Sequence, residues 1–456
     1  MVAVNTSFFG EMLQSIADRS RALIRRERRE PARERSAGLV DLCEALLSGR
    51  GEASGVALAN EILADYAELT IGPRIAFFEA LATTFGHDRA RIDTAIAAWR
   101  QTPSAQTAAE LHRAAEPRRL ELIRRLNLAP GGTAALVRMR EQLLDAMDHR
   151  PDLGVIDGDF IHLFTSWFNR GFLVLRRIDW STAAAILEKI IRYEAVHKIR
   201  DWADLRRRID LPDRRCYAFF HPALVDEPLI FVEVALTREI PTAIEPILSD
   251  GREVVDPERA TTAVFYSITS CQRGLAGVSF GHFLIKQVVE EVSREMPRIT
   301  RFVTLSPAPN FAEWLRRERA NEASVALDEE ERKALAALDR ANWVHDPDLV
   351  GALSEPMMRA AAWYYLRGRN ARGMPIDAVA RFHLGNGARL EQLNWPGDTS
   401  ERALAQSYGL MVNYLYDLDY IEENHETYAQ QRAVAAAGAI TRLVRSAVRE
   451  VVPVSG

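Results

Sequence analysis

A change in hydrophobic pattern near residue 170 constrains the fold of this chain more than any other feature. Before it, apolar residues recur at helical spacing in successive segments, separated by turns such as Pro130-Gly131-Gly132 and Pro151-Asp152-Leu153-Gly154. We find no strand pattern in this part. Short connections between amphipathic helices are typical of an antiparallel bundle. Residues 1–170 are therefore predicted to form an all-helical domain with a structural or oligomerisation role, because no catalytic constellation lies within it.

Strand-like segments start near Arg215, after a bridging section in which helices are expected at 183–195 and 201–209. Short runs rich in β-branched and aromatic residues then follow at Cys216–Phe220, Leu229–Leu236, Thr262–Ser270 and Arg301–Leu305. Residues 324–372 are predicted to be mainly helical, and the chain is predicted to end in one helix over 426–448. The order predicts a mixed sheet and an α+β fold class, with residues 171–456 as the second domain.

The segment from Phe265 to Lys286 leads from a predicted strand through three glycines, Gly274, Gly277 and Gly281, into an amphipathic helix. Such a loop can hold a pyrophosphate, because backbone N–H groups and the helix dipole attract the anion and glycine permits close approach. Its spacing matches neither the Rossmann fingerprint nor the Walker lysine loop. It is nearer the pyrophosphate loop of GNAT-type acetyltransferases, which hold coenzyme A. A glycine-rich turn that binds no ligand fits equally well.

Composition excludes several classes of protein. The 456 residues carry a net charge of -5 with no basic excess, which argues against broad nucleic-acid binding. No run of 18 apolar residues exists, so no membrane span is expected. Cys43, Cys216 and Cys271 are far apart and lack zinc-type spacing, which predicts free thiols, no metal site and a cytoplasmic location. A nucleophilic role for Cys271, beside the glycine loop, is the less favoured alternative.

Two residues have a local setting that suits chemistry. Ser306 follows a predicted strand, and Pro307 and Pro309 hold it in extended backbone. Sites form at the carboxyl ends of strands in α/β sheets. His383 precedes Gly385-Asn386-Gly387, which predicts a turn of fixed shape. The two residues are too far apart in the sequence for spacing alone to pair them.

Four blocks together resemble the malonyl-CoA decarboxylase family. They are Phe265–Lys286, Phe302–Phe311 with Trp314-Leu315, Phe382–Ala388 with Leu393-Asn394-Trp395, and Gly409–Tyr416. The patterns S-P-x-P-x-F, F-H-L-x-N-G-A and G-L-M-x-N-Y occur in this order, and their combination is specific. The resemblance extends over most of the chain.

The resemblance implies a helical N-terminal domain used in oligomerisation and a GNAT-like mixed α/β catalytic domain. It implies decarboxylation of malonyl-CoA to acetyl-CoA and carbon dioxide, without a metal or a cofactor beyond the coenzyme A of the substrate, in a homodimer or homotetramer. Ser306 and His383 match the family's catalytic serine and histidine, and Tyr416 matches its active-site tyrosine. The residues expected to hold coenzyme A are Arg273, Gly274, Leu275, Ala276, Gly277, Val278, Ser279 and Gly281.

Three positions depart from the family pattern. Ser279 stands where family members have an acidic residue, so no carboxylate role is expected there. Asn310 replaces a frequent glycine, and Arg381 stands where an asparagine is common.

The expected chemistry passes through an enolate, whose charge gathers on the thioester oxygen. We expect His383 to polarise or protonate Ser306, and Ser306 to protonate the carbon or donate to the enolate oxygen. The sequence leaves the order of these steps open. It also leaves two alternative functions, a GNAT-type acyl-CoA transferase and a non-catalytic acyl-CoA-binding scaffold.

Overall fold

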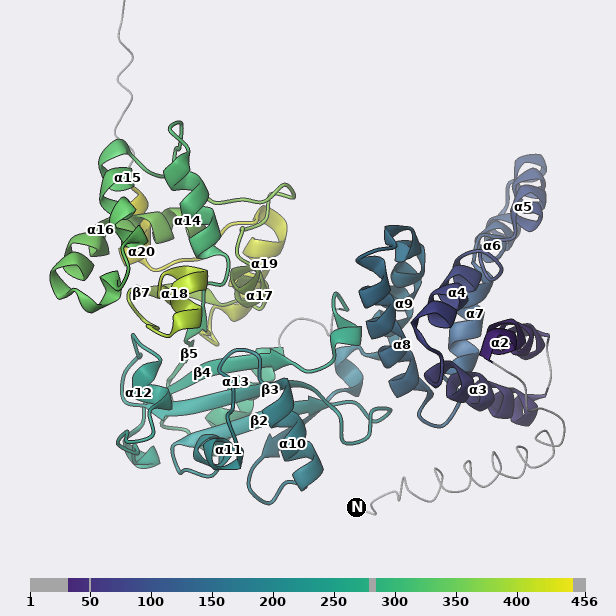
Figure 1. Cartoon of the computed structure of the whole chain (residues 1–456), viewed down its shortest axis with the longest axis horizontal. Helices are drawn as coiled ribbons and strands as arrows, with labels where there is room; N and C mark the ends of the chain where they lie inside the picture. The colour runs from purple at the N-terminus through teal and green to yellow at the C-terminus, as the bar shows by residue number, and fades with distance from the viewer. Residues whose placement is uncertain (1–31, 49–50, 279–283, 446–456) are drawn as a thin grey trace, which may run out of the picture. The chain divides into compact units, whose positions relative to one another are not determined.

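The computed structural model describes residues 32–48, 51–278 and 284–445, and the chain forms two compact units (Figure 1). Unit 1 consists of Met1–Leu173, His221–Val225 and Gln272–Phe280. Unit 2 consists of Val174–Phe220, Asp226–Cys271 and Gly281–Gly456. By its contacts, the glycine segment from Gln272 groups with unit 1, whereas the division by sequence put it in 171–456.

Unit 1 is built from helices in the residues that the structure describes. They are α2 (Ala32–Leu47), α3 (Glu52–Ala67), α4 (Ile71–Ala82), α5 (Arg89–Gln101), α6 (Ala105–Ala114), α7 (Arg118–Leu126), α8 (Gly132–Met147) and α9 (Gly154–Trp167). Side-chain caps start α5 and α6, where Asp88 accepts from the Arg91 amide and Ser104 forms a capping box with Thr107. The predicted helical N-terminal part is confirmed.

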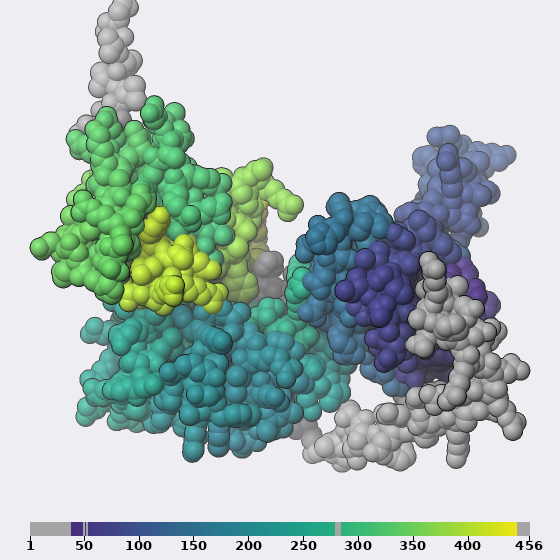
Figure 2. Space-filling view, in the orientation of Figure 1, coloured from purple at the N-terminus to yellow at the C-terminus, as the bar shows by residue number. Residues whose placement is uncertain are grey.

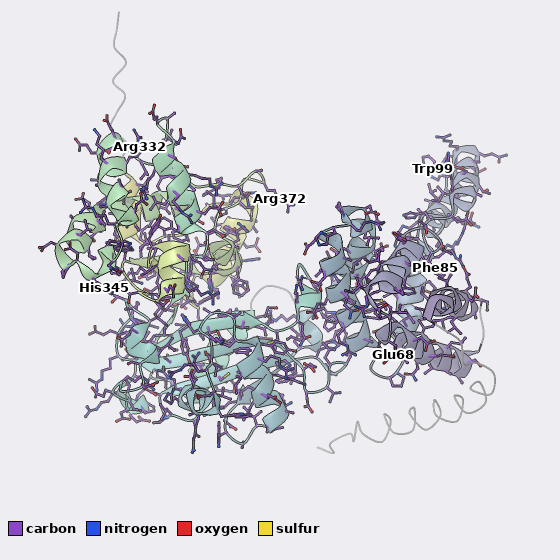
Figure 3. The ribbon with its side chains drawn as sticks, in the orientation of Figure 1. Glu68, Phe85, Trp99, Arg332, His345 and Arg372 are labelled. Atoms are coloured by element: carbon purple, nitrogen blue, oxygen red, sulfur yellow. The ribbon has the colours of Figure 1, made fainter. Side chains whose placement is uncertain are left out.

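The core of unit 1 lies along the apolar faces of these helices. Phe77, Phe78 and Phe85 are fully buried, and Figure 3 labels Phe85 among the packed helices. Helix α5, which the structure describes completely, has no buried side chain, and its Trp99 is 42% exposed. Helices α5 and α6 therefore pack mainly on each other.

Unit 2 is organised around an eight-stranded sheet. Its strands are β1 (Val174–Ile178), β2 (Arg214–Phe220), β3 (Pro228–Thr237), β4 (Thr262–Ser270), β5 (Arg301–Thr304), β6 (Ser306–Pro307), β7 (Arg389–Asn394) and β8 (Met411–Leu415). The order is β1-β2-β3-β4-β5-β8-β6, with β7 on β8. Of the eight strands in the described residues, only β4 and β5 pair with each other in parallel, because helix α13 (Leu284–Glu295) connects them as a crossover. The mixed sheet confirms the predicted fold class.

Strands β1, β7 and β8 of unit 2 were not predicted from the sequence patterns. Strand β1 places the start of the sheet at Val174, so the predicted start near Arg215 is wrong. Its five residues include two arginines, and only Ile178 is buried, so it lacks the apolar alternation of a half-covered strand. Strands β7 and β8 also lie where the sequence suggested none.

Helices surround this sheet. They are α10 (Ala184–Tyr193), α11 (Trp202–Ile209), α12 (Glu245–Leu248), α14 (Phe311–Ala320), α15 (Glu329–Leu335), α16 (Pro347–Leu366), α17 (Ala378–Gly385), α18 (Glu401–Ser407), α19 (Ile421–Gln431) and α20 (Gly438–Arg445). Helices α10 and α11 bury Ile186, Ile190 and Leu205 in one cluster with Ala218 and Phe231 of the sheet. Within unit 2, the green and yellow atoms of the later helices lie directly against the teal atoms of the earlier elements (Figure 2).

The single helix predicted over 426–448 is wrong in the described residues up to Arg445. Helix α19 stops at Gln431, because Arg432 takes left-handed backbone with φ 55°. The following segment pairs with β7, since the Leu390 amide donates to the Ala435 carbonyl over 2.9 Å. Strand pairing therefore overrides the local helical preference of an alanine-rich segment.

No helix among the described residues is long and apolar enough to cross a bilayer. In the same residues, no three side chains of His, Cys, Asp or Glu gather as a group that could hold a metal ion.

Candidate active site

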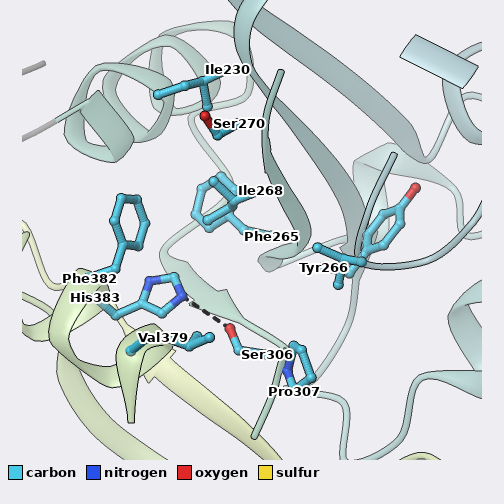
Figure 4. Close-up of a pocket in the computed structure, with 12 residues that line it drawn as sticks. Ile230, Phe265, Tyr266, Ile268, Ser270, Ser306, Pro307, Val379, Phe382 and His383 are labelled. Carbon is cyan, nitrogen blue, oxygen red and sulfur yellow. Dashed lines mark hydrogen bonds between the residues drawn. The ribbon is translucent and has the colours of Figure 1, made fainter. Parts of the chain in front are cut away.

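A cavity of about 300 Å³ opens in unit 2 (Figure 4). Most of its wall is apolar, with contributions from Phe265, Ile268 and Phe382. Its polar side chains include Ser306 and His383, which point toward each other in Figure 4. The cavity therefore combines an apolar space with a serine and a histidine on its wall.

Ser306 lies just after the end of β5, where the chain continues into β6. It begins β6 and pairs with Val412 of β8, so its backbone is extended as predicted from Pro307 and Pro309. Ser306 is 6% exposed. This setting holds the hydroxyl at one place on the cavity wall.

His383 lies in helix α17 rather than in a loop. Asp377 caps the start of this helix by accepting from the Ala380 amide over 2.8 Å. The predicted turn of fixed shape follows directly: Gly387 has φ 82°, and a Cβ there would lie 2.0 Å from the Ile421 carbonyl oxygen. A cap at one end and an obligatory glycine after the other hold the imidazole in place.

The three predicted catalytic residues come together in one hydrogen-bonded chain. Ser306 Oγ lies 3.1 Å from His383 Nε2, the contact drawn in Figure 4. His383 Nδ1 lies 2.8 Å from the hydroxyl oxygen of Tyr416. Tyr416 directly follows β8, and its amide donates to the Phe302 carbonyl over 2.8 Å. The tertiary fold thus pairs side chains that sequence spacing left unpaired.

Two residues that contact this series of hydrogen bonds, Thr304 and Tyr414, were not predicted from the sequence. Thr304 Oγ1 accepts from the Ser306 hydroxyl over 2.9 Å and from the Tyr414 amide over 3.1 Å. The Tyr414 ring stacks on His383, with centroids 4.6 Å apart. A signal existed, because residues two apart in a strand share a face. Thr304 and Ser306 form one such pair, and Tyr414 and Tyr416 form the other.

Burial controls the charges at the site. It lowers the pKa of His383 to about 3, so the imidazole is neutral near pH 7. Burial also raises the pKa of Tyr416 well above its ordinary value, so the phenol keeps its proton. Among the described residues that line the cavity, none has a side chain charged at neutral pH. The wall of the site is therefore largely apolar and formally uncharged.

The structure requires glycine at two positions of the loop, Gly274 and Gly277. A Cβ on Gly274 would lie 2.0 Å from the Val137 carbonyl oxygen of α8. Arg140 of α8 also donates to the Gly274 carbonyl over 2.8 Å, and its Nε bonds Asp157 over 2.7 Å. Gly277 has φ 75°, a left-handed backbone that favours glycine. Packing on α8 and the backbone turn thus require these glycines.

The other predicted loop residues that the structure describes form hydrogen bonds or an ion pair within unit 1. The amides of Leu275, Ala276 and Val278 donate to carbonyls inside the loop, and Arg273 forms an ion pair with Asp145 at 2.6 Å. Ser279 and Gly281 lie outside the described residues. A role of this loop in holding coenzyme A stays a prediction.

Cys271 is buried directly before the loop. Burial raises the pKa of its thiol well above its ordinary value, so the thiolate needed for nucleophilic chemistry is disfavoured.

Comparison with known proteins identifies the family of this chain. The C-terminal domain of malonyl-CoA decarboxylase matches residues 171–453, and its N-terminal domain matches residues 85–168. Crystal structures of malonyl-CoA decarboxylase from Rhodopseudomonas palustris and Agrobacterium vitis share 59% and 53% identity, with TM-scores of 0.87 and 0.86. In each case, 89% of this chain and 99% of that chain are covered. Mitochondrial malonyl-CoA decarboxylase of Anser anser anser is 38% identical over 72% of this chain and 69% of its own length. The chain therefore belongs to the malonyl-CoA decarboxylase family.

Proposed function

We propose that this protein decarboxylates malonyl-CoA to acetyl-CoA and carbon dioxide. The observation that carries the proposal is the chain of Ser306, His383 and Tyr416 on the wall of an apolar cavity. Membership of the family supports it, and the sequence motifs around Ser306 and His383 predicted it.

The reaction needs few groups. The bond between the α-carbon and the carboxylate breaks, and its electron pair forms the enolate of the thioester. Carbon dioxide leaves, and the α-carbon takes up a proton. The thioester itself accepts the electron pair, so we propose that the reaction uses no metal and no organic cofactor. We propose that, when substrate is bound, the Ser306 hydroxyl and the His383 N–H turn from their partners in the free protein and donate to the enolate oxygen, where one well-placed donor is worth about 3 kcal/mol.

The apolar wall suits the same reaction. A carboxylate that enters the cavity leaves water and meets no cationic side chain among the described lining residues. Carbon dioxide is uncharged, and the negative charge moves to the thioester oxygen near the donors. In a site of low dielectric constant these donors act more strongly than in water.

Two further features belong to the proposal. We infer that the loop of Arg273–Val278, with Ser279 and Gly281, holds the coenzyme A of the substrate. We also infer a cytoplasmic homodimer or homotetramer. The unburied α5 and the three buried free thiols support the inference. Sedimentation equilibrium of the purified protein tests the assembly, and a monomer would contradict it.

Incubation with malonyl-CoA and no acceptor tests the reaction. A decarboxylase forms acetyl-CoA under these conditions, whereas an acyl transferase without an acceptor or a binding scaffold forms none. We expect Ser306→Ala and His383→Ala each to lower kcat by about 100-fold or more, the usual size of an acid–base contribution. Absence of acetyl-CoA refutes the function. Wild-type rates in both variants refute the roles of the two residues.

A further inference from the structure

Thr304 lies at the end of the series of hydrogen bonds that links Tyr416, His383 and Ser306, beyond the groups proposed to act on the substrate. It ends β5 and is completely buried. We propose that Thr304 is a positioning residue whose hydroxyl oxygen draws the hydrogen of Ser306 away from His383 and so keeps the imidazole proton on Nε2. This inference deepens the decarboxylase function and rests on it for its catalytic meaning.

The number of hydrogens on each side chain determines which atom donates in each of these hydrogen bonds. The Ser306 hydroxyl has one hydrogen, which it donates to Thr304 Oγ1 over 2.9 Å. The 3.1 Å contact between Ser306 Oγ and His383 Nε2 must then use a hydrogen on the ring. A neutral imidazole has one N–H, so Nδ1 accepts in the 2.8 Å contact and Tyr416 donates. Donation therefore runs from Tyr416 through His383 and Ser306 to Thr304.

The ring of His383 is neutral because it is buried, and burial lowers its pKa to about 3. A doubly protonated ring would leave Tyr416 as an acceptor and remove the choice of tautomer. A neutral ring can carry its hydrogen on either nitrogen. Thr304 Oγ1, which accepts from Ser306, determines which nitrogen carries it.

Thr304 lies close to both Ser306 and His383. Thr304 and Ser306 are two apart in extended backbone, so their side chains share a face. The second bond to Thr304 Oγ1 comes from the Tyr414 amide over 3.1 Å. Tyr414 stacks on His383 with a 4.6 Å centroid separation. Thr304 thus contacts Ser306 directly and is one residue removed from His383.

The direction of donation matters for the reaction. With the hydrogen on Nε2, the neutral ring of His383 is a hydrogen-bond donor at the cavity wall, which suits stabilisation of an enolate oxygen. If Ser306 donated to Nε2 instead, His383 would act as a base toward the hydroxyl, the arrangement that activates a serine nucleophile. The oxygen of Thr304 therefore makes His383 a hydrogen-bond donor and not the base of a serine nucleophile.

Substitution at Thr304 tests the catalytic part. Thr304→Val removes the acceptor, and Thr304→Ser keeps it. We expect Thr304→Val to lower kcat by about 100-fold or more with little change in KM, because a wrong histidine tautomer lowers kcat by about 10⁴ in the Ser-His-Asp triad. Thr304→Ser should restore most of the rate. Thr262→Val is the matched control, because Thr262 is equally buried in β4 of the same sheet, and it should keep the wild-type kcat.

Nuclear magnetic resonance of protein labelled with ¹⁵N in histidine tests the tautomer directly. Two-bond ¹H–¹⁵N correlations show which ring nitrogen carries the hydrogen, and the spectrum of His383→Gln assigns the signal. We expect the proton on Nε2 in the wild-type protein and on Nδ1 in Thr304→Val. Tyr416→Phe should keep the proton on Nε2, since Ser306 still donates to Thr304.

The two readouts separate this proposal from the proposed function. A proton on Nδ1 in the wild-type protein overturns the proposal and needs no variant to fold. It is also overturned if Thr304→Val keeps the proton on Nε2 and the wild-type kcat. If the tautomer changes as expected but malonyl-CoA is not decarboxylated, the proposed function fails and the assignment of Thr304 stands.

Discussion

The buried carboxyl group of Asp377 offers a quantitative test of how the site is held. Asp377 caps α17, the helix that carries His383, and is 1% exposed. Its Oδ1 accepts from the Ala380 amide over 2.8 Å, and the Tyr364 hydroxyl donates to Oδ2 over 3.4 Å. Burial outweighs these bonds and raises the pKa of Asp377 from 3.8 to about 6.

This raised pKa makes stability depend on pH in a defined direction. Between pH 3.8 and about 6, folded Asp377 keeps a proton that the unfolded chain has lost. Its contribution is therefore fully present below pH 3.8 and is lost as the pH rises through 6. The loss amounts to about 3 kcal/mol in total, and to about 2–3 kcal/mol between pH 4 and pH 8, at 1.36 kcal/mol per pH unit.

Asp377→Asn removes this titration and keeps the cap, because Asn and Asp cap helices about equally well. We expect the variant to match the wild-type protein within about 0.5 kcal/mol at pH 4 and to exceed it by about 2–3 kcal/mol at pH 8. Urea unfolding at several pH values, followed by tryptophan fluorescence, measures the difference. Trp314 is a local reporter, since its ring lies 4.9 Å from that of Tyr364.

Asp201→Asn is the matched control. Asp201 caps α11 of the same unit by accepting from the Asp204 amide over 2.8 Å, but it is exposed. Its substitution should therefore shift stability by a similar small amount at every pH. A difference between Asp377→Asn and the wild-type protein that stays constant from pH 4 to pH 8 would refute the reasoning, as would a more stable wild-type protein at pH 8.

Three further predictions concern the loop and the histidine. Gly274→Ala should lower stability by about 1–3 kcal/mol in thermal unfolding, because its Cβ would meet the Val137 carbonyl at 2.0 Å; Gly251→Ala, with open space around the Cβ, should be neutral. Arg140→Met should cost about 1–3 kcal/mol, because it leaves the buried Gly274 carbonyl and the partly buried Asp157 carboxylate without this donor; unchanged urea midpoints would contradict this. Burial lowers the pKa of His383 from 6.5 to about 3, so its contribution to stability is present above pH 6.5 and is lost on acidification. His383→Gln should therefore lose about 3 kcal/mol less than the wild-type protein between pH 7.5 and pH 4; equal losses would exclude this cause.

Local patterns in the sequence determined much of this protein. Helical periodicity predicted the N-terminal helices, and runs of β-branched residues predicted β2 to β5, because each pattern records which side of one element is buried. Prolines predicted the extended backbone at Ser306, and the Gly385-Asn386-Gly387 turn was predicted from its glycines. The motifs around Ser306 and His383 predicted the family.

Only the tertiary structure decided the geometry of the site. Ser306, His383 and Tyr416 meet because the register of β6 on β8 and the packing of α17 bring distant segments together. The roles of Thr304 and Tyr414, and the need for glycine at 274 and 387, depend on contacts between segments far apart in the chain. The physical reason is that hydrophobic periodicity records burial one element at a time, whereas a hydrogen-bonded chain depends on distances of about 3 Å between elements.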